Sequence, residues 1–201
     1  KYMASLASVS NSYEENSFLL AFKREVKLLK NLAHPNMMRL LGYCLPPTPE
    51  LMASELCLIY KFAPRGDLKN ILKDDCKVVE LPWFYRLKIL KEVAVVLNYL
   101  HNNGAFHRDV KTENILVESD HTAKLSDYGL SKSKSSESST SNSMVIHSTV
   151  GTRYGTNGYK CPHYQNFSFP YNRKCEIFSF GIVVIEVVSG KLQGDIIDGI
   201  N

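Results

Sequence analysis

The stretch "HRDVKTENIL", residues 107–116, decides how the rest of the sequence is understood. Its first eight positions hold His, Arg, Asp, Lys, Glu and Asn, and the remaining two are apolar. Such a run is either a solvated surface loop or a group of side chains that meet at one ligand. Asp109, Lys111 and Asn114 supply a carboxylate, a cation and an amide oxygen, which together suit a charged ligand rich in oxygen.

The transfer of a phosphoryl group to a hydroxyl requires this set of groups. Catalysis of that reaction depends on positioning the nucleophile and neutralising phosphate charge. It needs a carboxylate near the acceptor, a cation near the phosphate, and oxygen ligands for Mg²⁺, which takes one or two protein oxygens. Asp127, in "SDYGLS" (126–131), lies thirteen residues after Asn114 and provides a second carboxylate. The two segments together predict a magnesium-nucleotide site.

The composition describes an ordinary soluble globular protein. Of the 201 residues, 44% are hydrophobic and 22% are charged, which is unlike a disordered chain. The net charge of +4 comes from scattered Lys and Arg residues. Nucleic acid is therefore not an expected partner, whereas a polyanionic nucleotide is compatible. Because the chain begins with Lys1, we expect it to be a fragment.

The cysteines and the apolar runs indicate the compartment. Five cysteines are present, and their odd number and the lack of a CxxC pair predict neither a disulfide framework nor a zinc site. Reduced thiols in the cytoplasm are expected. The longest apolar run, 177–188, is shorter than the roughly 20 residues of a membrane span and contains Glu186. We expect no membrane segment in this chain, which is either cytoplasmic or the intracellular part of a receptor.

Apolar periodicity predicts an α+β fold. One helix is expected from Ser17 to just before Pro35, and another after Pro82. The buried stripe of the first is predicted to contain Phe18, Phe22, Val26 and Leu29; that of the second contains Trp83, Leu87, Leu90, Val93, Leu97 and Leu100. The other expected elements are strands at 37–44, 55–62, 115–119 and 122–126, a short helix capped by Asp67, and a helix at about 174–188. The serine-rich segment 131–149 is not expected to become ordered on its own.

The sequence resembles the eukaryotic protein kinases over nearly its whole length. "HRDVKTENIL" followed by "KLSDYGLSK" (124–132) resembles the catalytic loop and the metal-binding motif of that family. "LLGYC" (40–44), "NYLHNNGAFHRDVKTENIL" (98–116) and "GTNGY" (155–159) are most similar to plant receptor-like kinases and interleukin-1-receptor-associated kinases. The resemblance implies an incomplete two-lobed kinase-like fold, with a partial small lobe at 1–62 and a partial large lobe at 63–201.

The resemblance also implies roles for the polar residues. Asp109 matches the catalytic base, Lys111 the lysine that contacts the transferred phosphate, and Asn114 and Asp127 the ligands of Mg²⁺. Thr156 matches the threonine of Ser/Thr kinases that bonds the catalytic Asp and Lys. Two further expectations are that Arg108 pairs with a phosphorylated activation-loop residue, the candidates being Ser148, Thr149 and Thr152, and that His107 packs beneath the metal motif.

Glu25 is expected to need a cation. It lies on or beside the apolar stripe of the first helix, where an unpaired carboxylate is costly. In the family, the equivalent glutamate pairs with a lysine that holds the nucleotide phosphates. Lys1 is the candidate for that lysine, and a second register places Ser5 at the position and leaves the site without a lysine.

The resemblance places the adenine of ATP near the segment between the lobes. Tyr60 takes the position that limits access behind the nucleotide, and the adenine would bond to the backbone around Lys61 and Ala63. Leu116 is assigned to the same nucleotide site.

The sequence departs from the family pattern at several positions. It contains no GxGxxG, "CPH" (161–163) stands where Ala-Pro-Glu is usual, and Glu176 replaces a buried Asp that anchors the catalytic loop. Tyr128 replaces a Phe and adds a hydroxyl that requires a partner when buried. Two readings follow. The first is an ATP- and Mg²⁺-dependent protein serine/threonine kinase, inactive as this isolated chain; the second is a pseudokinase that acts as a scaffold.

Overall fold

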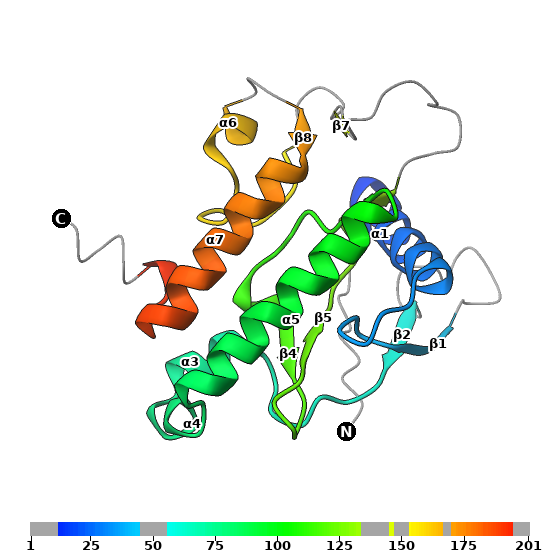
Figure 1. Cartoon of the computed structure of the whole chain (residues 1–201). Helices are drawn as coiled ribbons and strands as arrows, with labels where there is room; N and C mark the ends of the chain where they lie inside the picture. The colour runs from blue at the N-terminus through cyan, green and yellow to red at the C-terminus, as the bar shows by residue number, and fades with distance from the viewer. Residues whose placement is uncertain (1–11, 45–55, 134–144, 147–152, 167–169, 195–201) are drawn as a thin grey trace.

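The computed structural model describes residues 12–44, 56–133, 145–146, 153–166 and 170–194. The fold is α+β, as predicted, with two-stranded antiparallel sheets and several helices (Figure 1). The helical elements are α1 (Ser12–Asn31), α3 (Leu68–Lys73), α4 (Asp75–Val79), α5 (Trp83–Asn102), the 3₁₀ turn η2 (Thr112–Asn114), α6 (Pro162–Gln165) and α7 (Arg173–Ser189). The strands are β1 (Leu40–Cys44), β2 (Cys57–Tyr60), β3 (Ala105–Phe106), β4 (Ile115–Val117), β5 (Ala123–Leu125), β6 (Lys132–Ser133), β7 (Val145–Ile146) and β8 (Tyr171–Asn172).

Helix α1 lies beside the sheet of β1 and β2 at one end of the molecule (Figure 1). It begins at Ser12, five residues before the predicted Ser17, so that start was wrong. Phe22 is buried as expected, but Phe18 is 40% exposed and does not belong to the buried stripe.

The two long helices α5 and α7 lie side by side in Figure 1. The Arg86 Nη1 atom of α5 donates a 2.7 Å hydrogen bond to the Val187 carbonyl of α7. Gly190 ends α7 in the left-handed conformation, with φ of 72°, which a glycine adopts without strain. Helix α5 begins directly after Pro82, as predicted, but its predicted buried stripe was wrong at Trp83 and Leu87, which are exposed.

Strands β4 and β5 form a hairpin between α5 and the sheet of β1 and β2, which is called the small sheet below. In the hairpin, Ile115 lies opposite Leu125. A bridge from Met37 to Leu125 connects this hairpin to the chain that enters β1. Asp67 caps α3 by accepting a 2.9 Å bond from the Asn70 amide, as predicted. The main core gathers apolar residues of these elements, among them Leu68, Ile71, Ile89, Val96, Leu100, Ile115, Val117, Leu125 and Val183.

The connection between β1 and β2, residues 45–55, lies outside the described residues, and so do most residues of the serine-rich segment. Within the part of the chain that is described, none of the helices has the length and apolar character needed to span a bilayer.

Candidate functional site

The loop that follows β3 is anchored from two sides. From one side, the buried Glu176 of α7 accepts a 2.7 Å bond at Oε1 from the Arg108 amide, while its Oε2 lies 2.5 Å from His101 Nε2. From the other, the ring of His107 is fully buried, with Nε2 2.9 Å from the Ser126 carbonyl and Nδ1 accepting a 3.2 Å bond from the Asp109 amide. His107 therefore packs structurally, as predicted. Glu176 makes the anchoring contact despite its extra methylene.

Asp109 lies at the centre of a cluster of polar groups. Its Oδ1 accepts bonds of 2.9 Å from the Thr156 amide and 2.7 Å from the Thr156 hydroxyl. Its Oδ2 lies 3.0 Å from Lys111 Nζ and accepts a 3.2 Å bond from Asn114 Nδ2. Lys111 also donates a 2.8 Å bond to the Thr156 hydroxyl, which closes the cluster. The structure thus brings together the residues that the sequence predicted for acid-base and phosphate chemistry.

The contacts of Asp109 determine its charge. Burial raises the pKa of its carboxyl, but the hydrogen bonds from Thr156 and Lys111 and the positive charge of Lys111 outweigh burial and lower the pKa overall. The carboxylate is consequently ionised at neutral pH. An ionised carboxylate can accept the hydrogen bond of an alcohol and hold it in place.

Asn114 and Asp127 lie on two segments that are tied together through Ser126. The Ser126 amide and hydroxyl both donate to the Asn114 carbonyl, at 2.9 Å and 3.0 Å. Asp127 is exposed, and its Oδ1 accepts a long 3.4 Å bond from the Gly129 amide. An amide oxygen and an exposed carboxylate are the oxygen donors that Mg²⁺ prefers, and Mg²⁺ takes few of them from protein. The donor set therefore fits magnesium.

The backbone is strained at both segments. Arg108 and Asp127 have φ of 74° and 61°, in the left-handed region that non-glycine residues seldom adopt. Such outliers persist where the surrounding structure fixes them, and they cluster at functional sites. Here they orient the two loops that carry Asp109 and Asn114 on one side and Asp127 on the other.

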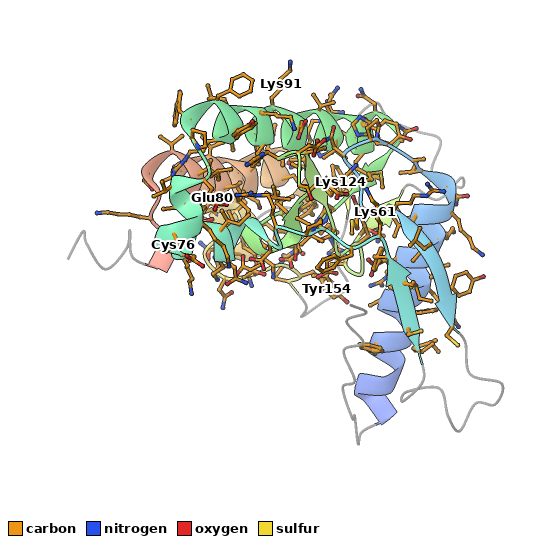
Figure 2. The ribbon with its side chains drawn as sticks, turned by 90° about the horizontal axis from the view of Figure 1, so that it is seen from below. Lys61, Cys76, Glu80, Lys91, Lys124 and Tyr154 are labelled. Atoms are coloured by element: carbon orange, nitrogen blue, oxygen red, sulfur yellow. The ribbon has the colours of Figure 1, made fainter. Side chains whose placement is uncertain are left out.

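Arg108 is held by tyrosines. It is 5% exposed, and its guanidinium lies 4.6 Å from the centre of the Tyr154 ring and 5.6 Å from that of Tyr171. Its Nη2 donates a 3.4 Å bond to the Tyr164 hydroxyl. Figure 2 shows Tyr154 on the lower surface of the main body of the molecule. The predicted phosphorylated partners, Ser148, Thr149 and Thr152, lie outside the described residues, so their pairing with Arg108 stays a prediction.

Glu25 reaches the site from α1. It is 7% exposed, and its Oε1 accepts hydrogen bonds from the Tyr60 hydroxyl and, at 3.1 Å, from the Tyr128 amide. Burial raises the pKa of Glu25, and these two neutral donors only partly offset it. Lys1 lies outside the described residues, so the predicted ion pair stays a prediction. The Tyr128 hydroxyl finds the partner it requires by donating a 2.9 Å bond to the Leu125 carbonyl.

The predicted adenine-binding segment follows β2. Tyr60 is the last residue of that strand, and its hydroxyl turns inward to Glu25. The Lys61 amide donates a 3.3 Å bond to the Arg39 carbonyl, while its ammonium pairs with Glu118 at 3.1 Å. Ala63 is buried, and Leu116 is partly buried in β4.

Sequence reasoning missed a second buried carboxylate below the loop. Glu186 of α7 is 1% exposed and accepts bonds from the Tyr159 hydroxyl at 2.8 Å and the Thr112 hydroxyl at 3.0 Å. It also accepts a 2.8 Å bond from the Gln193 amide. The signal in the sequence was a lone acid within an apolar helix, which indicates that buried donors must surround it.

The α+β architecture and the loop around Asp109 define the class of protein kinases. Residues 5–195 match the family described as Protein kinase domain, and the chain belongs to that family. The predicted kinase-like fold and the resemblance on which it was based are thereby confirmed.

Curated relatives narrow the resemblance to the receptor-like group. The chain is 38% identical over 175 residues to Serine/threonine-protein kinase PBL34 of Arabidopsis thaliana, an alignment that covers 85% of this chain and 32% of that protein. It is 39% identical over 178 residues to Serine/threonine-protein kinase PBL13 of the same plant, covering 87% and 33%. Identity to its Wall-associated receptor kinase-like 3 is 35% over 173 residues, covering 85% and 22%. The chain thus spans about a third or less of the length of these relatives.

Proposed function

We propose that the chain carries the catalytic machinery of an ATP- and Mg²⁺-dependent protein serine/threonine kinase. The observation that carries the proposal is the cluster in which one ionised carboxylate, Asp109, is held by Lys111 and Thr156 at 2.7–3.0 Å. The names of the relatives, which are serine/threonine-protein kinases, support the same substrate class.

In this proposal Asp109 orients the acceptor. The carboxylate accepts the hydrogen bond of a Ser or Thr hydroxyl and receives its proton as the phosphorus–oxygen bond forms. Lys111, whose ammonium already lies 3.0 Å from Asp109, places positive charge beside the transferred phosphoryl group. The Thr156 hydroxyl bonds both side chains and so holds the base Asp109 and the cation Lys111 in fixed relative positions.

Asn114 and Asp127 are proposed to hold Mg²⁺, which would neutralise phosphate charge. The adenine would lie against the backbone of Lys61 and Ala63, between Tyr60 and Leu116, and Lys1 would pair with Glu25 and contact the phosphates. We further propose that 1–62 forms part of a small lobe and 63–201 part of a large lobe, with ATP bound between them. Protein hydroxyls in the cytoplasm are the proposed substrates, and nucleic acid is not a proposed partner.

The test measures transfer of labelled phosphate from ATP to a generic Ser/Thr acceptor by the protein in its full natural length. An Asp109→Asn variant should lose about 10²–10⁴-fold in rate, because removal of a positioned general base has that effect. Lys69→Met removes a partly exposed pair with Glu113, and neither residue is among the hydrogen-bond or ion-pair partners of the Asp109 carboxylate, so this variant is the control and should keep most activity. Equal rates for the parent and Asp109→Asn would refute the proposal.

A pseudokinase is the second candidate, and one observation favours it. The described partners of Glu25 are a hydroxyl and an amide, both neutral, although the family pairs this position with a lysine. "CPH" at 161–163 adds a second departure. A scaffold of this kind would bind nucleotide weakly or not at all and would show no difference between the parent and Asp109→Asn. Binding of a fluorescent ATP analogue, with and without Mg²⁺, separates a nucleotide-binding scaffold from one that binds none.

A further inference from the structure

Two cysteines lie directly opposite each other at the end of the small sheet. In the antiparallel register of β1 and β2, Tyr43 pairs with Leu58 and Cys44 with Cys57. Residues directly opposite in an antiparallel pair have Cα atoms about 4.5–5.5 Å apart and side chains on the same face. Disulfides usually join residues whose Cα atoms are about 4.4–6.8 Å apart. The register thus places two thiols at a separation that a disulfide can span.

These two thiols are also accessible. Cys44 is exposed and Cys57 is partly exposed. Cys175, in contrast, is buried, and burial raises the pKa of its thiol. Cys76 is exposed but lies in α4, at the opposite end of the molecule from β1 and β2 (Figure 2). Cys161 is partly exposed and contacts the buried Cys175. A reagent in solution therefore meets Cys44 and Cys57 as a pair that is at least partly exposed on both sides, and Cys76 as a single thiol.

We propose that Cys44 and Cys57 form a redox modification site, in which a low-molecular-weight disulfide such as glutathione disulfide converts them into an intrachain disulfide. The proposal concerns the small sheet and does not depend on phosphoryl transfer by the chain.

The reaction proceeds by two thiol–disulfide exchanges. The exposed Cys44 loses its proton, and its thiolate attacks one sulfur of glutathione disulfide, forming a mixed disulfide and releasing one glutathione thiolate. The Cys57 thiolate then attacks the Cys44 sulfur and releases the second glutathione. Two cysteine thiols and one glutathione disulfide thus give one protein disulfide and two glutathione thiols. The protein loses two electrons and two protons, and the reagent gains them.

The bond would change the small sheet at a defined point. It would close a covalent ring from residue 44 to residue 57 and fix the paired ends of β1 and β2. Strand β2 also carries Tyr60, whose hydroxyl bonds Glu25. Oxidation is therefore expected to stabilise the pairing that presents Tyr60 to the site, because a crosslink restricts the unfolded chain.

The experiment equilibrates the 201-residue chain in glutathione buffers of increasing oxidised fraction, blocks remaining thiols with an alkylating reagent, and digests after glutamate. Cleavage at Glu50 and Glu55 separates the two cysteines, but the peptide with Cys57 extends to Glu80 and also contains Cys76. The link is therefore assigned to Cys57 by the alkylation of Cys76. The expected product is a joined peptide pair that reduction splits, with Cys76 alkylated. Cys76→Ser should give the same product, and the oxidised chain should unfold at a higher urea concentration than the reduced chain.

Single variants complete the test. Cys44→Ser and Cys57→Ser should abolish the joined peptides and the urea shift. Because Cys161 contacts Cys175 and offers a second thiol pair, binding of phenylarsine oxide is measured in a Cys161→Ser background. There Cys44→Ser and Cys57→Ser should lose it, whereas Cys76→Ser should keep it. The proposal is overturned if Cys44 stays reduced in fully oxidising buffer. It is equally overturned if Cys44 stops at the glutathione adduct, pairs with Cys76, Cys161 or Cys175, or links two chains.

Discussion

Two buried carboxylates of similar exposure have opposite electrostatic environments. Asp109, on the loop after β3, is 8% exposed, and Glu25, on α1, is 7% exposed. The pKa of Asp109 is lowered because Thr156 and Lys111 outweigh burial, whereas the pKa of Glu25 is raised because burial outweighs its hydrogen bonds from Tyr60 and Tyr128. The nearby carboxylate of Asp127 raises the pKa of Glu25 further. The comparison teaches that at similar burial the hydrogen bonds and the charge of the partners together decide whether an acid is stabilised as an anion.

The largest expected effect comes from removal of the cation beside Asp109. Lys111→Met leaves a buried carboxylate without its partner at 3.0 Å, and breaking a buried ion pair destabilises a protein by about 3 kcal/mol or more. The free energy of unfolding, measured in urea at pH 7, should fall by that amount. The pKa of Asp109 should rise, because burial would no longer be outweighed, as is the case for Glu25.

A partly exposed pair provides the control for this variant. Lys69 and Glu113 have side chains that are each 31% exposed, and such pairs contribute at most about 1 kcal/mol. Lys69→Met should therefore cost much less than Lys111→Met. Equal losses would mean that burial of Asp109 has no special electrostatic consequence, and the comparison would fail.

The next effect is the loss of charge at Asp109 itself. Asp109→Asn removes an anion whose lowered pKa means that the folded state favours the ionised form. Hydrogen bonds to charged groups contribute about 1.5–3 kcal/mol, so a loss of that size is expected at pH 7. The contribution is present above the unfolded pKa of about 3.9 and is lost as pH falls through the folded pKa. The difference in unfolding free energy between wild type and variant should therefore shrink as pH is lowered below about 4.

The same chemical change at Glu25 should have the opposite sign. Glu25→Gln keeps an oxygen that accepts from Tyr60 and Tyr128 and removes a buried charge, so a gain of about 1 kcal/mol is expected at pH 7. The pKa of Glu25 is raised in the folded state, so the buried charge destabilises the fold only when the carboxyl ionises. This cost in unfolding free energy grows as pH rises from the unfolded pKa of about 4.3 through the folded pKa. The gain should disappear at lower pH. A large loss at pH 7 would instead reveal a cation outside the described residues, as predicted for Lys1.

The fold and the site differ in how far the sequence predicts them. Periodicity located α5 because that helix buries a continuous apolar face, but it did not reveal that Trp83 stays 53% exposed. A long apolar run located α7, whose buried face also holds Glu176 and Glu186. The spacing of Asp109, Lys111 and Asn114 predicted the cluster because the three residues lie on one tight loop. The partners of Glu25 were missed because Tyr60 and Tyr128 reach it only through tertiary packing.

The cysteine pair was missed for a related reason. The register of β1 and β2 depends on the length and path of the connection at 45–55, and cysteine spacing in the sequence does not contain that information. Likewise, nothing in the sequence spacing indicates that the guanidinium of Arg108 lies over the rings of Tyr154 and Tyr171.

An effect of similar size is expected at the hydroxyl that supports Glu25. Tyr60→Phe keeps the ring and removes one of the donors to Oε1, which should cost about 1–2 kcal/mol of unfolding free energy at pH 7. The pKa of Glu25 should rise, so the loss should be smaller in acid, where the protonated carboxyl needs less support. Combining Tyr60→Phe with Glu25→Gln tests the coupling, because the hydroxyl should matter less when its partner is neutral. Additive effects would show that the hydroxyl does not act through Glu25.

The smallest effect is expected where a carboxylate pairs with a cation at the surface. Lys61 Nζ lies 3.1 Å from Glu118, but the Lys61 side chain is 59% exposed, so water and salt screen the attraction. Lys61→Ala should lower the unfolding free energy by less than about 1 kcal/mol, and the loss should vanish at high salt. Lys111→Met should keep most of its effect in the same salt, because Asp109 is shielded from solvent. Both carboxylates are buried, so the contrast lies in the lysines, which are 59% exposed at position 61 and 18% exposed at position 111. If both variants responded alike to salt, shielding of Lys111 would have no electrostatic consequence, and the comparison of the two pairs would fail.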